Sequence, residues 1–111
     1  MSLYETHFNN IKEGRKKVEI RVLDKKRKKL NFGDIIQFEK LPLKEDYINT
    51  KIIKLQKFDS FYNLYKNMDK KLLAHPIDIT INEQIERSRQ IYSKEKEKLG
   101  VLAIYFELIS D

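Results

Sequence analysis

The residue types best suited to chemistry lie in one octapeptide, Gly14-Arg15-Lys16-Lys17-Val18-Glu19-Ile20-Arg21. It places an amine (Lys16), a carboxylate (Glu19) and a guanidinium (Arg21) within six residues. Apolar and charged residues alternate through residues 17–23, which is typical of a half-buried strand. The leading glycine can adopt a positive φ, end a helix and turn the chain into that strand. The sequence therefore predicts a small polar site on a strand, with Lys16 in the turn before it.

Three interpretations of this site are open. In an enzyme, neighbouring positive charge would favour a neutral Lys16 amine as base or nucleophile, and Glu19 would orient a water or share a proton. In a binding site, Arg21 would contact a phosphate or base edge, and Glu19 would accept from an exocyclic amine. In the third, Glu19 and Arg21 are an ion pair on a charged strand face, worth less than about 1 kcal/mol if exposed.

The charge of the chain is concentrated in one segment. Residues 12–29 hold ten Lys/Arg and three acids, a net charge of +7, while the whole chain carries +6. A concentrated basic segment favours a polyanionic partner, because phosphates release counterions to Lys and Arg. The alternative is a solvated, lysine-rich surface turn. The candidates for contact with a nucleic-acid backbone are Arg15, Lys17, Lys25, Lys26, Arg27, Lys28 and Lys29.

The remaining pattern predicts a mixed set of strands and helices. A helix over about 7–13 should begin after an N-cap at Thr6, and Asp24–Leu30 should form an exposed turn or a single helical turn. Phe61, Leu64, Tyr65 and Met68 recur at helical spacing, which indicates a buried stripe and not a platform for base stacking. The other expected strands are a short one at 3–5 and longer ones at 17–23, 35–39, 47–57 (with a break in phase that suggests a bulge) and 101–108. Helices should follow caps at Asp59 or Ser60 and at Thr80, and one more helical turn should start at Ser93.

These elements define the class of protein. The 111 residues suffice for one domain spanning 1–111, and about five strands with about three helices predict an α+β fold, a small mixed β-barrel or curled sheet with helices packed on it. The chain has no cysteine and only two histidines, so we expect no metal site and no cofactor. No membrane-spanning or signal-peptide pattern occurs, and we expect a cytoplasmic protein of unknown oligomeric state.

The motif Gly14-x-Lys16-x-x-Glu19-x-Arg21 resembles the signature of the ASCH domain, a small barrel related to the PUA RNA-binding fold. Three further landmarks resemble the bacterial stand-alone members, so the resemblance covers nearly the whole chain. They are the Gly33-Asp34 turn into an Ile-rich strand, the Phe58-x-x-Phe61-x-x-Leu64-Tyr65 helix, and Tyr92-Ser93-x-Glu95 leading to Gly100-Val101-Leu102-Ala103-Ile104.

The resemblance implies a basic cleft between barrel and helices that binds RNA or a modified nucleoside, lined by Lys16, Glu19 and Arg21, with Tyr92 and Glu95 as candidates for its rim. One branch of the family hydrolyses the amide of acetylated cytidine, and its motif has Lys at the place of Lys16 but Thr at the place of Glu19. This sequence keeps the lysine and the arginine of that motif but lacks the hydroxyl of the threonine. The alternative function is a hydrolase of modified nucleosides or of RNA, with Lys16 and Glu19 catalytic. A third possibility is a regulatory module that binds an acidic protein surface. We expect His7 at the surface and His75 in a loop without a role.

Overall fold

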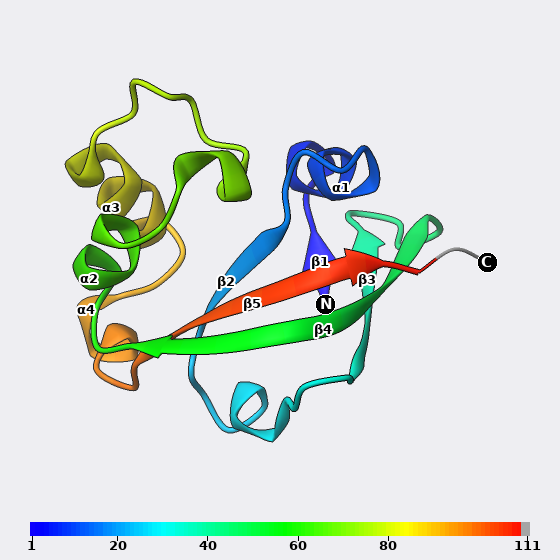
Figure 1. Ribbon diagram of the computed structural model, residues 1–111, viewed down its shortest axis with the longest axis horizontal. Helices are drawn as coiled ribbons and strands as arrows, with labels where there is room; N and C mark the ends of the chain where they lie inside the picture. The colour runs from blue at the N-terminus through cyan, green and yellow to red at the C-terminus, as the bar shows by residue number, and fades with distance from the viewer. Residues whose placement is uncertain (110–111) are drawn as a thin grey trace.

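The computed structural model describes residues 1–109 and contains a single five-stranded sheet (Figure 1). Its strand order is β1-β3-β4-β5-β2, and every neighbouring pair is antiparallel except β1 with β3. The sheet curls into a half-barrel with helices packed against it, which confirms the predicted α+β class. The strands are β1 (Ser2–Leu3), β2 (Val18–Val22), β3 (Ile35–Lys40), β4 (Tyr47–Phe58) and β5 (Val101–Leu108).

β5 is an interior strand of the sheet, as its apolar sequence predicts. It pairs with β4 on one side and β2 on the other, and its first four residues are buried. Both faces are covered, which explains why the run is apolar throughout. The predicted bulge also occurs, because the register of β4 against β5 shifts between Ile52 and Lys54.

The sheet separates two hydrophobic cores. One lies within the curl and is closed by α1 (Glu5–Lys12); the other lies on the opposite face beneath α2 (Phe61–Lys66). The first core contains Phe8, Ile11, Phe38, Ile52, Leu102 and Ile104, and the second contains Val18, Val22, Phe61, Leu64, Tyr65 and Val101. The stripe on α2 is therefore buried, as predicted.

Both faces of β2 are covered, whereas its alternating sequence predicts one exposed, charged face. Val18 and Val22 face α2, while Glu19 and Arg21 lie opposite Ile104 and Leu102 of β5 and so share the inward-curling face. Glu19 is only 6% exposed. The charged face is enclosed because the curl brings the two edge strands together: Nη2 of Arg21 donates to the carbonyl oxygen of Ser2 in β1 at 3.3 Å.

Each α-helix begins directly after a predicted capping residue, except the first one. Ser60, Thr80 and Ser93 each accept a backbone N–H as predicted, and they begin α2, α3 (Ile81–Arg89) and the single turn α4 (Lys94–Glu97). With that turn the α-helices among the described residues number four, against about three expected. The two short 3₁₀ helices are η1 (Arg27–Lys29), within the predicted exposed turn, and η2 (Lys70–Leu73).

The predicted cap at Thr6 is wrong. α1 begins at Glu5 after Tyr4, which makes no side-chain capping bond. β1 is docked on β3 up to Leu3, so the chain turns directly from the sheet edge into the helix, and the N–H of Phe8 donates to the carbonyl of Tyr4. In residues 1–109 no helix has the length and apolar character needed to cross a bilayer.

Candidate ligand-binding cleft

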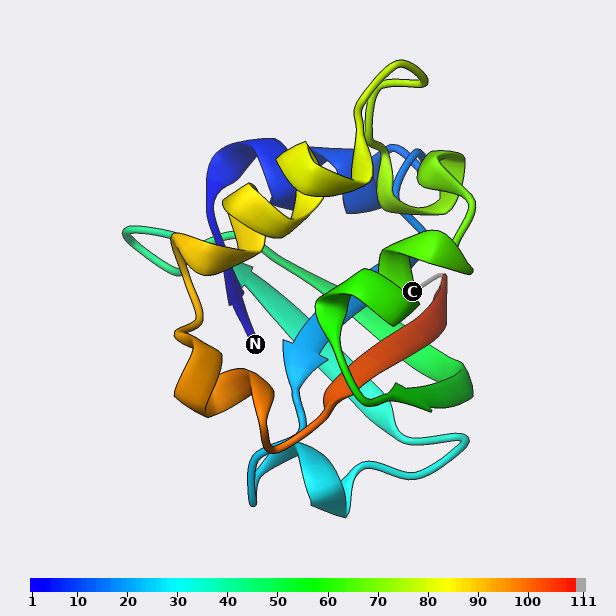
Figure 2. The ribbon, with the colours of Figure 1, turned by 90° about the vertical axis from the view of Figure 1, so that its left-hand side faces the viewer.

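A cleft of about 560 Å³ opens where the two edge strands of the half-barrel approach each other. In Figure 1 the upper end of β2 lies between α1 on one side and η2 with α3 on the other, and Figure 2 shows α3 passing in front of α1. The volume is in the range of small-molecule and cofactor sites. The polar and aromatic residues that line it include His7, Asn10, Lys16, Glu19, Arg21, Phe61, Tyr65, His75, Arg87, Ser88 and Tyr92.

The turn after α1 fixes the position of Lys16. Gly14 has a φ of 79°, a conformation that favours glycine, and it lets the chain fold back over the end of the helix. The carbonyl of Asn10 then accepts from the N–H groups of both Arg15 and Lys16, each at 2.9 Å. The next N–H, of Lys17, donates to the carbonyl of Leu72 at 2.8 Å and ties the turn to η2. The backbone at Lys16 is thus fixed by hydrogen bonds to α1 and to η2.

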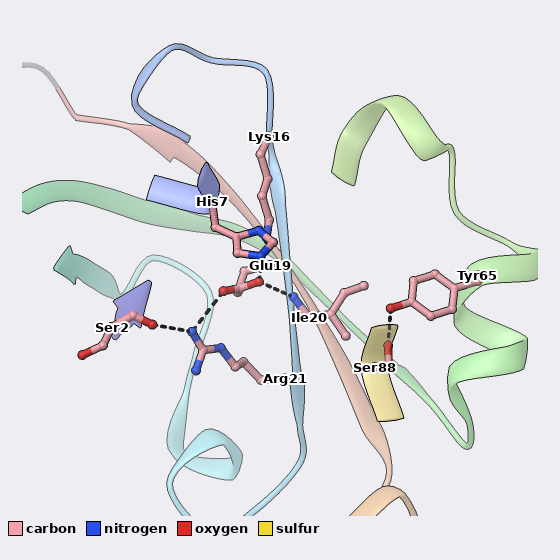
Figure 3. Close-up of polar contacts among 8 residues, drawn as sticks. All are labelled: Ser2, His7, Lys16, Glu19, Ile20, Arg21, Tyr65 and Ser88. Atoms are coloured by element: carbon pink, nitrogen blue, oxygen red, sulfur yellow. Dashed lines mark hydrogen bonds and ion pairs between the residues drawn. The ribbon is translucent and has the colours of Figure 1, made fainter. Parts of the chain in front are cut away.

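Glu19 is held by three donors at the base of the cleft (Figure 3). Its Oε1 accepts from Nζ of Lys16 and from the N–H of Ile20, and its Oε2 accepts from Nη2 of Arg21, all at 3.0 Å. Burial alone would raise the pKa of Glu19. The positive charges of Lys16 and Arg21, with the hydrogen bonds, outweigh that effect and hold the pKa at about 2. The carboxylate is therefore ionised at neutral pH.

The arrangement leaves specific hydrogen-bonding capacity unused. A carboxylate has about four acceptor positions, and three are occupied, so Oε2 of Glu19 can accept one more bond. Within residues 1–109, Nε and Nη1 of Arg21 donate to no protein atom. A pKa of about 2 lies far from the value that suits a general base at neutral pH. Glu19 can thus accept one further hydrogen bond, and Arg21 can donate further ones, from adjacent positions in the cleft.

The opposite wall is aromatic and internally bonded. Phe61 stacks with Tyr65 and Tyr92 at centroid distances of 6.3 and 6.0 Å. The hydroxyl of Tyr65 lies 2.6 Å from Oγ of Ser88 (Figure 3). Oγ of Ser88 in turn donates to the carbonyl of Gln84. Burial raises the pKa of the Tyr65 hydroxyl, which stays protonated and donates to Ser88. The wall offers flat apolar surface against which a ring can pack.

Three further basic residues line the cleft, namely His7, His75 and Arg87. The sequence did not assign them to the site. His7 on α1 has Nδ1 3.5 Å from Nζ of Lys16, and its pKa is lowered by burial and by Lys16. His75 follows η2 and is bonded through Nδ1 to Nε2 of Gln84 at 3.0 Å. Burial first, and then the charges of Arg87 and Lys16, lower the pKa of His75 to about 4. Both imidazoles are therefore neutral at pH 7, and the cleft carries three cations against one carboxylate.

The expected site residues divide into two groups. Lys16, Glu19, Arg21 and Tyr92 all line the cleft, but Glu95 does not. Glu95 is a solvent-exposed residue that pairs with Lys98. Its neighbour on the opposite side of α4, Glu97, is the inward acid: it accepts from the N–H of Phe61 at 2.8 Å and pairs with Arg89.

The basic segment is split between the two ends of β2. Lys16 precedes the strand, whereas Lys25–Lys29 follow it and surround η1 at the lower end in Figure 1. Two of the residues expected to contact a nucleic-acid backbone are engaged elsewhere: Arg15 pairs with Glu13, and Arg27 pairs with Asp24 at 3.1 Å. The other five candidates, Lys17, Lys25, Lys26, Lys28 and Lys29, are exposed. Among residues 1–109 no group of three or more acids and histidines is arranged to hold a metal ion.

A small curled sheet with a GxKxxExR motif lining its cleft defines the class of this protein. The ASCH domain family model matches residues 1–110, and the chain belongs to that family. The crystal structure of hypothetical protein PH0355 is similar over 98% of this chain and 96% of that one, with 34% identity and a TM-score of 0.85. The solution NMR structure of protein PF0455 from Pyrococcus furiosus is similar over the full length of both chains, with 29% identity and a TM-score of 0.70. None of the curated proteins matches the chain.

Proposed function

We propose that this ASCH domain binds RNA, or a nucleotide-like ligand, with one nucleotide unit seated in the cleft. The observation that supports this most directly is the pairing of Glu19 with Arg21, in which an ionised acceptor with one free position lies beside a guanidinium with free donors. A base edge that carries an exocyclic amine next to a ring acceptor matches this pair. Membership of a family associated with RNA binding points to the same class of ligand.

The aromatic wall supports the same proposal. Single-stranded nucleic acids are recognised by stacking of splayed bases on aromatic side chains combined with hydrogen bonds to their edges. Tyr92 and Tyr65 line the cleft together with Glu19 and Arg21, so both kinds of contact are available in one cavity. An RNA strand leaving the cleft along β2 would reach the exposed lysines around η1, which we propose as backbone contacts.

A hydrolase acting on a modified nucleoside is the second candidate, and His7 is the observation that favours it. Its imidazole is neutral near pH 7 and lies 3.5 Å from the amine of Lys16 inside the cleft. A neutral imidazole is a suitable general base for activating a water. The ion pair of Lys16 with Glu19, at 3.0 Å, argues against the lysine as nucleophile, because the amine's charge is engaged.

One set of measurements separates these functions. Binding of short single-stranded RNAs and of free and acylated nucleosides would be measured by calorimetry for the wild type, Lys16→Ala and Arg21→Met, with product analysis by chromatography. The control is Lys98→Met, which alters an exposed, ion-paired basic residue outside the cleft. We expect Arg21→Met to weaken binding about tenfold or more and the control to be unchanged.

The outcomes are distinct. Deacylation by the wild type that Lys16→Ala abolishes at unchanged fold would establish the hydrolase. Binding without turnover, weakened by Arg21→Met and steeply reduced by salt, supports the binding protein. If the wild type neither binds nor converts any of these ligands, both candidates are wrong.

A further inference from the structure

Four basic side chains from four different segments meet at the α1 end of the cleft. They are His7 on α1, Lys16 in the turn before β2, His75 after η2 and Arg87 on α3, and all four line the same cavity. Their mutual proximity also appears in their titration. After burial, the charges of Arg87 and Lys16 lower the pKa of His75, and Lys16 and Arg87 likewise lower that of His7. We call these four residues the basic cluster.

The basic cluster has an excess of positive charge that the protein does not neutralise. Glu19 is the acid that lines the cleft, and its carboxylate is shared between Lys16 and Arg21. Arg87 is exposed and forms no ion pair within residues 1–109. Glu83 lies one turn earlier on α3, and the charge of Arg87 contributes to lowering its pKa after the hydrogen bonds from Thr80. The two side chains form no ion pair, and Oε1 of Glu83 accepts from the N–H and hydroxyl of Thr80 in the capping box. Arg87 therefore presents a free guanidinium to the cleft.

His75 adds a donor without adding charge. Because Nδ1 is bonded to the amide nitrogen of Gln84, it acts as an acceptor, and the proton of the neutral ring lies on Nε2. Nε2 of His75 donates to no other residue in the described part of the chain. A ring N–H, an ammonium and a fork of guanidinium donors are the groups that bind the oxygens of a phosphate.

We propose that the basic cluster is a phosphate subsite, so that the cleft selects a phosphorylated nucleotide unit over a free nucleoside. The proposal rests on the function proposed above and defines its ligand more narrowly. The base would lie at the Glu19–Arg21 pair against Tyr92, and its phosphate beside Arg87 and His75. Arg87 is the specificity-determining residue, because it is the cluster cation with no acid partner on the described chain.

The test compares each nucleoside 5′-monophosphate with its nucleoside, by calorimetry at low salt, for the wild type, Arg87→Met, Arg87→Lys and the control Lys98→Met, an exposed cation outside the cleft. Wild type and control should bind the nucleotide about tenfold or more tightly than the nucleoside, since one charge-assisted contact is worth about that factor. Arg87→Met should reduce the difference to less than about threefold and leave nucleoside affinity unchanged, and Arg87→Lys should restore part of it.

A second readout is the titration of His75 followed by NMR. A bound phosphate favours the protonated imidazole, so the nucleotide should raise the pKa of His75 and the nucleoside should not. Equal affinity of the wild type for nucleotide and nucleoside would overturn the phosphate subsite and leave the proposed function standing. The same holds if the preference persists in Arg87→Met. If neither ligand nor RNA binds the wild type, the proposed function and the subsite fail together.

Discussion

Nζ of Lys16 and Oε1 of Glu19 lie 3.0 Å apart with both side chains only 8% exposed. The second oxygen of Glu19 pairs with Arg21, so one buried carboxylate neutralises two cations from the same motif. Removing one member of a buried ion pair costs far more than the pair contributes, because the remaining charge stays desolvated. The motif is therefore a structural unit as well as the base of the cleft.

Substituting Glu19→Gln should lower the free energy of unfolding by about 3 kcal/mol at pH 7, since Lys16 and Arg21 would be left without their counter-charge. Urea denaturation measures this change. The control is Glu13→Gln, which removes the acid of the exposed Arg15–Glu13 pair and should cost less than about 1 kcal/mol. Equal effects of the two substitutions would contradict the structural role of Glu19.

The same carboxylate predicts an acid-sensitive stability. The pKa of Glu19 is about 2 in the folded chain and ordinarily 4.5, so the unfolded state binds the proton first as the pH falls. Its stabilisation, about 3 kcal/mol, is complete above pH 4.5 and disappears between pH 4.5 and 2. Unfolding measured from pH 6 to 2 should show this decrease in the wild type and a flatter curve in Glu19→Gln.

His75 predicts a separate decrease in stability at higher pH. Its folded pKa of about 4 lies below the ordinary 6.5, so the neutral form is favoured by folding and the unfolded chain takes up the proton first. Stability should therefore fall as the pH decreases from 6.5 to 4. His75→Asn keeps an acceptor for Gln84 but cannot titrate, so the stability of this variant should fall less steeply between pH 6.5 and 4. Part of the pH dependence should remain, because the pKa of His7 is lowered in the same direction. An unchanged slope in the variant would refute the assignment.

The aromatic wall can be tested by a double-mutant cycle. Ser88→Ala leaves the buried hydroxyl of Tyr65 without its 2.6 Å partner and should cost about 1–3 kcal/mol. Adding Tyr65→Phe removes the orphaned hydroxyl, so the double variant should be destabilised by less than the sum of the single changes. Chemical denaturation of the four proteins gives the coupling energy. Strict additivity would mean that the hydrogen bond does not stabilise the wall.

Local signals predicted most of the fold. The side chains of Ser60, Thr80 and Ser93 each bond a backbone N–H within three residues, so their effect is contained in the sequence itself. The apolar run of β5 likewise requires burial on both faces. The start of α1 was misplaced because it depends on β1 docking on β3, a contact between segments more than thirty residues apart.

The sequence mainly identified those residues of the cleft lining that come from one continuous segment. Lys16, Glu19 and Arg21 share a strand and its turn, whereas His75 and Arg87 reach the cleft through the packing of η2 and α3. One signal was available for that wall. Ser88 falls among Ile81, Ile85 and Tyr92 at helical spacing, so a polar group was to be expected on the inward face of α3.

The lysines around η1 allow the last prediction, which asks whether the ligand extends beyond the cleft. Replacing Lys25, Lys28 and Lys29 by Gln should leave mononucleotide affinity unchanged, because these exposed residues lie at the other end of β2 from Lys16. For a longer single-stranded RNA, the slope of log affinity against log salt should become shallower by about 0.7 for each phosphate that the variant no longer neutralises. The matched control replaces the lysines at 94, 96 and 98, which are also exposed and lie in the single turn α4 or directly after it. An identical slope in the wild type and both variants would mean that the basic run is a solvated turn and that recognition is confined to the cleft.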